Sequence, residues 1–212
     1  KISAQSLRMN SEQKYKEGDG PLWSAESSNK EELLIFTDKQ QVYKLRLRDL
    51  ADTKASVLGA YLPTELNFEE GEHVFGAVLP GDYSAHLLMV FENGKVAKVD
   101  MKSYETKTNR KKLTNAYGKG EIIGMLYCKE ERQVALFSNI DKCVVFNTKD
   151  IMTKTSRSSQ GVQVMTMRRK SLLTRMEFPE VSLASTQGYE ARTIPSSGYY
   201  LKDDSQTSLF EE

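Results

Sequence analysis

The sequence predicts an all-β protein made of about four repeated sheets, or blades, arranged around an axis. Three stretches of the chain align without a gap, and each consists of an apolar run, a polar turn and a second strand. The equivalent positions Val42, Val96 and Cys143 lie 54 and then 47 residues apart. A period near 50 residues with several short strands per copy is typical of bladed or arrayed folds.

The first two elements of each copy are predicted to form an antiparallel hairpin. Its first strand is the apolar run, at residues 33–36, 87–90 and 134–137. In the second copy the turn contains Asn93-Gly94, and Asn-Gly between two apolar runs is a strong hairpin signal. The other two copies have polar turns of matching length.

The second strand of the first hairpin alternates apolar and basic residues from Val42 to Arg48. Because successive side chains of a strand point to opposite faces, Lys44, Arg46 and Arg48 are expected on one face. The second copy keeps this pattern, and the third copy has mostly lost it.

A further strand is expected to open each copy after a glycine–acid pair. The expected strands start at Pro21, His73 and Ile122. Glycine at these points supplies a turn that other residues would strain.

The two ends of the chain are expected to meet. Residues 162–167 look like a strand that follows the third copy, and residues 2–9 look like a strand with no upstream partner. Pairing them would add a fourth, partial blade to the three full repeats and would remove exposed sheet edges. Residues 1–178 are therefore predicted to be one bladed domain. Residues 179–212 are expected to be an irregular, partly disordered acidic tail.

Composition narrows the class of protein. Hydrophobic residues make up 39%, charged residues 28%, and the net charge is +1. The sequence has no apolar run of membrane-spanning length and no leader, so no membrane association is expected. The chain opens at Lys1 in strand-like sequence, as expected of a piece of a larger protein. Cys128 and Cys143 lack metal-ligand spacing and are predicted to be reduced thiols.

Catalytic motifs are absent from the sequence. We find no phosphate-binding glycine loop and no nucleophile elbow, and the carboxylates are scattered. The fragment is therefore predicted to be non-catalytic by itself, with no cofactor, no metal and no small-molecule substrate.

Basic residues are unevenly spread along the sequence, and this uneven spread is the second observation that bears on function. Between Lys95 and Lys119 there are eight basic residues and two acids. Two smaller clusters lie at residues 44–48 and 157–170. On equivalent strands such clusters would form a curved basic track that binds a nucleic-acid backbone without reading bases; the alternative is an ordinary solvated surface. The candidate DNA-binding residues are Lys44, Arg46, Arg48, Lys95, Lys98, Lys102, Lys107, Arg110, Lys111, Lys112, Lys119, Arg157, Arg168 and Arg169.

The repeated motif resembles that of a known family. Residues 33–45, with the segment Thr37-Asp38-Lys39-Gln40-Gln41-Val42-Tyr43-Lys44-Leu45, resemble the blade motif in the C-terminal domains of the A subunits of DNA gyrase and topoisomerase IV. Residues 156–162 resemble the segment that links blades in that family. The resemblance covers about residues 1–170.

The resemblance implies a β-pinwheel, a propeller-like fold whose blades exchange strands, with duplex DNA bent on its outer basic rim. Lys44, Arg46, Lys95, Lys98 and Arg157 fall on basic positions of the family motif. The resemblance also implies a bacterial, cytoplasmic and nucleoid-associated protein whose partners are double-stranded DNA, the B subunit of the enzyme, and the rest of the A subunit. The parent would be an ATP-dependent type II topoisomerase that binds ATP and Mg²⁺ elsewhere.

Two departures from the gyrase pattern favour a topoisomerase IV-like protein. The stretch Gln13–Gly20 lacks the Gln-Arg-Arg-Gly-Gly-Lys-Gly box of the gyrase A subunit, and about four units is fewer than gyrase usually has. Such a domain would support relaxation and decatenation.

Two other functions stay open at this point. One is a protein-interaction propeller without DNA binding, and the other is an enzyme with a site in a central channel. Steeply salt-dependent duplex binding would separate DNA binding from the protein-interaction propeller, and a cluster of reactive side chains at the ring centre would indicate the enzyme.

Overall fold

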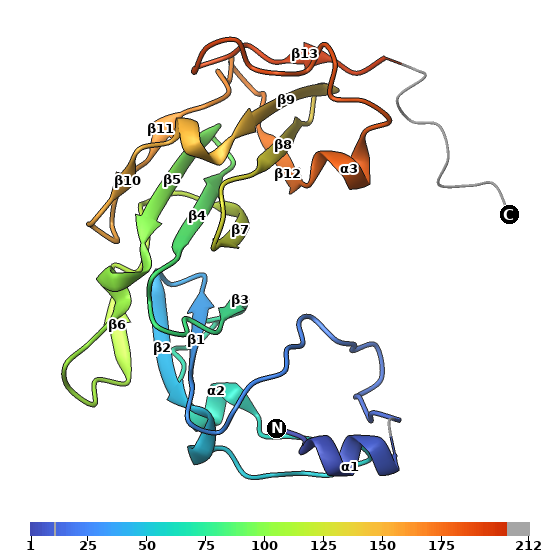
Figure 1. The fold of residues 1–212 in the computed structure, drawn as a ribbon, viewed down its shortest axis with the longest axis vertical. Coiled ribbons are helices and arrows are strands. Elements are labelled where there is room, and N and C mark those ends of the chain that lie inside the picture. The colour runs from blue at the N-terminus through green and yellow to red at the C-terminus, as the bar shows by residue number, and fades with distance from the viewer. Residues whose placement is uncertain (11, 203–212) are drawn as a thin grey trace, which may run out of the picture. The chain divides into compact units, whose positions relative to one another are not determined.

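The computed structural model describes residues 1–10 and 12–202, and strands dominate it (Figure 1). Contacts divide the chain into two compact units. The first comprises Lys1–Asp82 and Thr106–Thr114, and the second comprises Tyr83–Glu105 and the chain from Asn115 onward. Within the described residues the strands form three sheets, one in the first unit and two in the second.

The sheet of the first unit has the strand order β3-β1-β2-β6. The strands β1 (Glu32–Thr37) and β2 (Gln41–Arg46) form the predicted hairpin, with Phe36 opposite Val42. The strand β3 (Val74–Val78) pairs with β1, and β6 (Lys112–Thr114) pairs with β2.

The middle sheet is built on the hairpin of β4 (His86–Phe91) and β5 (Lys95–Asp100). The strand β7 (Ile122–Cys128) pairs with β4. On the other side, β5 pairs with two short strands, β10 (Thr153–Lys154) in parallel and β11 (Val162–Gln163) in antiparallel orientation.

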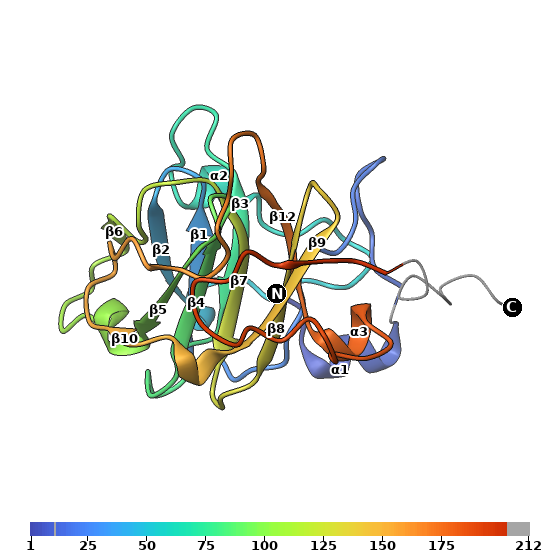
Figure 2. The same cartoon turned by 90° about the horizontal axis from the view of Figure 1, so that it is seen from above.

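The third sheet has the strand order β12-β8-β9-β13. Its hairpin is formed by β8 (Gln133–Ser138) and β9 (Lys142–Asn147), flanked by β12 (Leu173–Glu177) and β13 (Tyr199–Tyr200). Figure 2 shows β8, β9 and β12 of this sheet from above.

Helices are short. They are α1 (Ala4–Met9), α2 (Leu62–Glu65) and α3 (Pro179–Ser182). Each hairpin is also followed directly by one 3₁₀ turn: Leu47–Asp49, Met101–Tyr104 and Thr148–Asp150. This turn is therefore a further repeated feature of the fold.

The hairpin strands are buried almost throughout. Leu34, Ile35 and Phe36 are at most 1% exposed, so β1 is covered on both faces. In the second unit, side chains from the middle and third sheets share one core, which contains Leu88, Val96, Val134, Leu136 and Val144 among others. Burying a side chain of this size stabilises the fold by about 1.5–3 kcal/mol.

The three predicted hairpins and the all-β class are confirmed, but the opening strands need correction. The strands β3, β7 and β12 pair with β1, β4 and β8, so each joins the hairpin that precedes it in the chain. Residues 21–23, where a strand was expected, have no strand structure.

The expected pairing of the two ends is wrong for the described residues. Residues 4–9 form α1, because Ser3 caps the helix by accepting a hydrogen bond from the Ser6 N–H and the following residues favour a helix. Ile2 forms a single bridge with Thr53, whereas Val162 pairs with Val96 of β5. No fourth sheet completed by the termini occurs in residues 1–10 and 12–202.

The segment expected to be an irregular tail is partly ordered into the third sheet. Residues 179–202 contain α3 and β13, and Tyr189 is 4% exposed. The acidic residues Asp203, Asp204, Glu211 and Glu212 lie outside the described residues. The division of the chain at residue 178 stays a prediction.

Candidate nucleic-acid interface

The strand lysines of the first two copies are buried. Lys44 on β2 is 7% exposed; its Nζ lies 3.5 Å from Glu32 Oε2 and donates to Thr106 Oγ1 at 3.0 Å. Lys98, at the equivalent position of β5, is 3% exposed. It forms an ion pair with Glu131 and donates to the Thr148 carbonyl at 3.2 Å.

These contacts change the interpretation of both lysines. A buried ammonium group needs a carboxylate partner and further hydrogen bonds to offset its lost hydration. The hydrogen bonds from Lys98 and Thr148 hold the pKa of the Glu131 carboxyl below its ordinary value of 4.5. Lys44 and Lys98 therefore act as internal counter-ions, and neither is placed to contact a phosphate.

The sequence held a signal for this arrangement. The third copy has Val145 at the position of Lys44 and Lys98, and Val145 is 1% exposed. An apolar residue at the equivalent position of a repeat indicates an interior site. Period-2 alternation alone could not reveal it, because both faces of the strand are covered.

The predicted basic row on β2 is shorter than expected. β2 ends at Arg46, and Arg48 lies in the following 3₁₀ turn. Both side chains are exposed, at 39% and 63%, and both are near Asp49, with Nε–Oδ distances of 3.1 Å and 4.0 Å. Asp49 therefore offsets part of their charge.

The loop of residues 106–111 in the first unit brings three exposed cations together. Lys107, Arg110 and Lys111 are exposed, and within the described residues no acid forms an ion pair with them. The loop lies beside the end of β2, since Lys111 accepts a backbone hydrogen bond from Lys44. The loop and β2 line a cavity of about 190 Å³ that also contains acids, namely Glu32, Asp49 and Glu65.

Three of the predicted DNA-binding residues are only partly accessible. The charged groups of two contact other parts of the protein, and the third is half-buried. Lys112 lies 3.2 Å from Glu69 and 5.5 Å from the centre of the Tyr43 ring. Arg157 donates to the Ser103 carbonyl at 2.7 Å. Lys95 is half-buried at the start of β5.

The remaining candidates are exposed in the second unit. They are Lys102 in the 3₁₀ turn after β5, Lys119 before β7, and the pair Arg168 and Arg169 before β12. The backbone around the arginine pair is fixed, because the Arg168 N–H donates to Ser171 Oγ at 2.7 Å. These side chains are accessible to a large polyanion.

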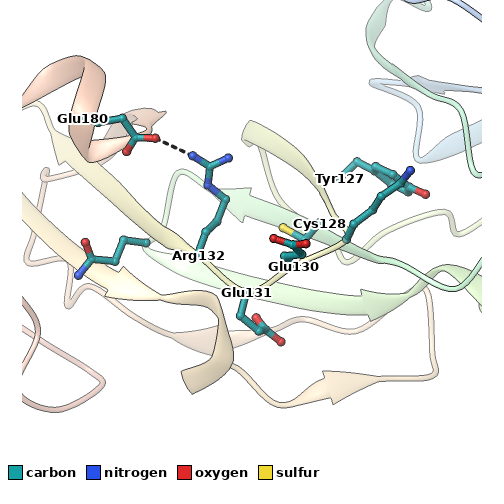
Figure 3. A pocket seen from close by; sticks show the side chains of 8 residues that line it. Tyr127, Cys128, Glu130, Glu131, Arg132 and Glu180 are labelled. Atoms are coloured by element: carbon teal, nitrogen blue, oxygen red, sulfur yellow. Dashed lines mark hydrogen bonds and ion pairs between the residues drawn. The ribbon is translucent and has the colours of Figure 1, made fainter.

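A separate hollow in the second unit contains an arginine, several carboxylates and a cysteine. It is lined by residues 127–133 and Glu180, and Figure 3 shows Arg132 directed toward Glu180, with 2.7 Å between Nη2 and Oε1. The Arg132 guanidinium also stacks 3.5 Å from the centre of the Phe178 ring. Burial raises the pKa of Cys128 to about 11, so this thiol is protonated at neutral pH. The Arg132–Glu180 pair thus ties α3 to the hollow, while Glu131 forms an ion pair with Lys98.

Neither a metal-binding cluster nor a membrane-spanning helix occurs in the described residues. No cluster of three or more His, Cys, Asp or Glu side chains is arranged to hold a metal ion. None of the helices in the described part of the chain has the length and apolar character of a membrane span.

Sequence comparison finds relatives among the A subunits of type II topoisomerases, although no family model matches the chain. The chain is 22% identical over 166 residues to the A subunit of DNA topoisomerase 4 from Staphylococcus aureus, which covers 76% of the chain and 21% of that protein. It is 23% identical over 153 residues to the chloroplastic/mitochondrial A subunit of DNA gyrase from Arabidopsis thaliana, covering 71% and 16%. The chain thus spans about a fifth of the length of these relatives.

Solved structures with the same fold come from the same proteins. The C-terminal domain of DNA topoisomerase IV superimposes with a TM-score of 0.73 at 20% identity, covering 83% of this chain and 56% of that one. The E. coli ParC C-terminal domain gives a TM-score of 0.61 at 13% identity, covering 77% and 68%. The resemblance drawn from the blade motif and the β-pinwheel fold are confirmed.

Proposed function

We propose that this chain, a homologue of the A subunits of type IIA topoisomerases with the fold of their C-terminal domains, binds and bends duplex DNA. The observation that carries the proposal is the loop of residues 106–111. It presents three exposed cations that pair with no acid in residues 1–10 and 12–202, on a fold whose similar structures are C-terminal domains of topoisomerase IV and gyrase A.

Because the net charge is only +1, DNA binding would depend on the local distribution of positive charge. A phosphate backbone is attracted by Lys and Arg side chains that are free to approach it, whereas cations paired inside the protein contribute little. Lys44 and Lys98 are therefore removed from the proposed contacts. The proposed set is Arg46, Arg48, Lys102, Lys107, Arg110, Lys111, Lys119, Arg168 and Arg169, with Lys95, Lys112 and Arg157 as partly covered neighbours.

The wider role is proposed from the relatives. The chain would act within an ATP-dependent type II topoisomerase, joined to the rest of the A subunit, together with a B subunit, and with ATP and Mg²⁺ bound outside this region. The missing basic box in residues 13–20 favours support of relaxation and decatenation over supercoiling. A bacterial, cytoplasmic, nucleoid-associated setting is part of the same proposal.

A salt titration of duplex binding tests the proposal. With two duplexes of unrelated sequence, log K should fall linearly with log salt concentration, by about 0.9 for each phosphate contacted. The two duplexes should bind alike, because phosphate contacts carry no base information. Absence of duplex binding at low salt would favour a protein-interaction module instead.

A further inference from the structure

The segment of residues 186–201 runs along the outer edge of the third sheet (Figures 1 and 2). It meets β9 twice. Glu190 forms a parallel bridge with Val145, and Tyr199 pairs in antiparallel orientation with Cys143. The backbone between these two points leaves the sheet and returns to it.

The middle sheet has the same two pairings at the equivalent positions. Thr153 pairs in parallel with Lys98, and Val162 pairs in antiparallel orientation with Val96. Since Val96 is equivalent to Cys143, Lys98 is equivalent to Val145. Both pairings of the middle sheet therefore recur in the third sheet. In each case the partner residue lies 37 positions later in the chain, 190 instead of 153 and 199 instead of 162.

A glycine precedes the antiparallel residue in both segments. Gly161 has φ +72° and comes before Val162, and Gly198 has φ +68° and comes before Tyr199. A Cβ atom would lie 2.4 Å from the Val96 carbonyl oxygen at Gly161 and 3.4 Å from the Cys143 carbonyl oxygen at Gly198. A glycine with positive φ thus precedes the edge strand in both sheets, but only Gly161 lies tightly against the partner backbone; at Gly198 the atom nearest the Cβ would be Met165 Cε, at 2.3 Å.

The two segments differ in where they come from along the chain. The one at the middle sheet follows the next hairpin, β8–β9, and is an exchanged strand. Between β9 and the segment at the third sheet lie β10, β11, β12 and α3, and none of these forms a further hairpin. The third sheet therefore receives its edge strand without a further repeat.

Polar and apolar contacts both hold the segment in place. The Val145 N–H donates to the Tyr189 carbonyl, Ala191 donates to the Val145 carbonyl, and Leu201 donates to the Asp141 carbonyl, each at 2.8 Å. Leu183, Tyr189, Tyr199 and Leu201 pack on a cluster that includes Phe137 and Cys143.

We propose that residues 186–201 are an intramolecular cap that takes the place of an exchanged strand at the β9 edge of the third sheet. An open edge on β9 would offer unpaired N–H and C=O groups to another chain, and a second copy of this protein is the partner that fits it best. Repeat proteins commonly need such a cap at a terminal unit. The proposal does not depend on DNA binding.

The test compares two neighbouring residues of β13 in the full chain. Tyr199 packs into the cluster, whereas Tyr200 is 68% exposed on the other face. The double variant Tyr199→Asp/Leu201→Asp should release the cap, and Tyr200→Asp is its matched control. Amide exchange of Val145 should be at least about tenfold faster in the double variant, and light scattering should show self-association that grows with concentration.

The amides of β4, such as Leu88, report whether the rest of the unit stays folded. Unchanged Val145 exchange and a monomeric double variant would overturn the proposal. Equal effects in the Tyr200→Asp control would overturn it as well.

A second variant works even where the double variant does not fold. Tyr199→Cys places a thiol opposite Cys143, within the Cα separation that a disulfide requires. Mild oxidation should give an intramolecular crosslink that slows Val145 exchange and keeps the chain monomeric. Tyr200→Cys should give none. Crosslinking of Tyr200→Cys to the same extent as Tyr199→Cys would contradict the cap.

Discussion

At the scale of single residues, equivalent positions of the repeat carry different side chains with different contacts. Lys44 and Lys98 are buried with carboxylate partners, and Val145 at the same position is buried among apolar side chains. Charge at a strand position therefore does not by itself indicate a binding surface. The exposed loop cations, which follow no repeat pattern, are the better candidates.

Replacing Lys98 should affect stability more than binding. Lys98→Met leaves Glu131 without its ion pair, and this should cost about 1–3 kcal/mol of unfolding free energy. The cost is below that of a fully buried pair because the Glu131 side chain is 42% exposed. Urea denaturation measures the loss, and duplex affinity per folded molecule should stay at the wild-type value. A clear loss of duplex affinity in the folded variant would show that Lys98 does contribute to DNA binding.

The same ion pair predicts a pH dependence. The pKa of Glu131 is lowered in the folded state from 4.5, by its hydrogen bonds with Lys98 and Thr148. The resulting stabilisation is fully present above the unfolded-state pKa and is lost as pH falls through the lower folded-state pKa. Unfolding free energy should therefore decrease as pH falls below about 4.5.

Two variants isolate this contribution. Glu131→Gln should weaken the dependence below pH 4.5, whereas Glu130→Gln, at an exposed neighbour, should retain it. Denaturant titrations at several pH values provide the measurement. Identical pH profiles for wild type and Glu131→Gln would show that the pair is not linked to folding.

At the scale of elements, sequence patterns of neighbouring residues predicted the structures that neighbouring residues form. The apolar runs and polar turns placed all three hairpins, because a hairpin is specified by neighbouring residues. The partners of β3, β6 and β10 could not be predicted from spacing, since each pairs with a hairpin distant in the chain. Residues 2–9 differ from the expected strand because Ser3 caps a helix and the residues after it favour helical structure.

The glycine of the linking segment should be far less replaceable than a glycine in an open loop. Gly161→Ala combines a positive φ with a Cβ placed 2.4 Å from the Val96 carbonyl oxygen, and the surrounding backbone cannot move away cheaply. Gly188→Ala is the matched control, because Gly188 has φ +91° with nothing within 4 Å of its Cβ.

Both variants carry the conformational cost of about 1–3 kcal/mol, and Gly161→Ala should add about 1–3 kcal/mol from the close contact. Urea denaturation compares them. Equal unfolding free energies would mean that β11 is free to shift away from β5.

At the scale of the whole molecule, the net charge is only +1. The proposed DNA binding therefore depends on where the positive charges lie and not on their total. The strand residues Lys44, Lys98 and Lys112 form ion pairs with acids, whereas in the described part of the chain the cations of loop 106–111 form none. Sequence composition could show the excess of basic residues between 95 and 119. It could not show which of them are paired, because Glu69 and Glu131, the partners of Lys112 and Lys98, lie outside that stretch.

Two triple variants with the same net charge separate local from overall electrostatics. Lys107→Gln/Arg110→Gln/Lys111→Gln and the control Lys129→Gln/Lys149→Gln/Lys154→Gln each change the net charge from +1 to −2, because each removes three positive charges. All six residues are exposed, so neither variant should lose much stability. If the loop contacts phosphates, the first variant should lower the slope of log K against log salt by about 2.7, that is 0.9 for each contact removed. The control should bind more weakly only through the general field, which salt screens over about 10 Å at 0.1 M. Equal slopes in the two variants would assign duplex binding to overall charge and would remove the loop from the interface.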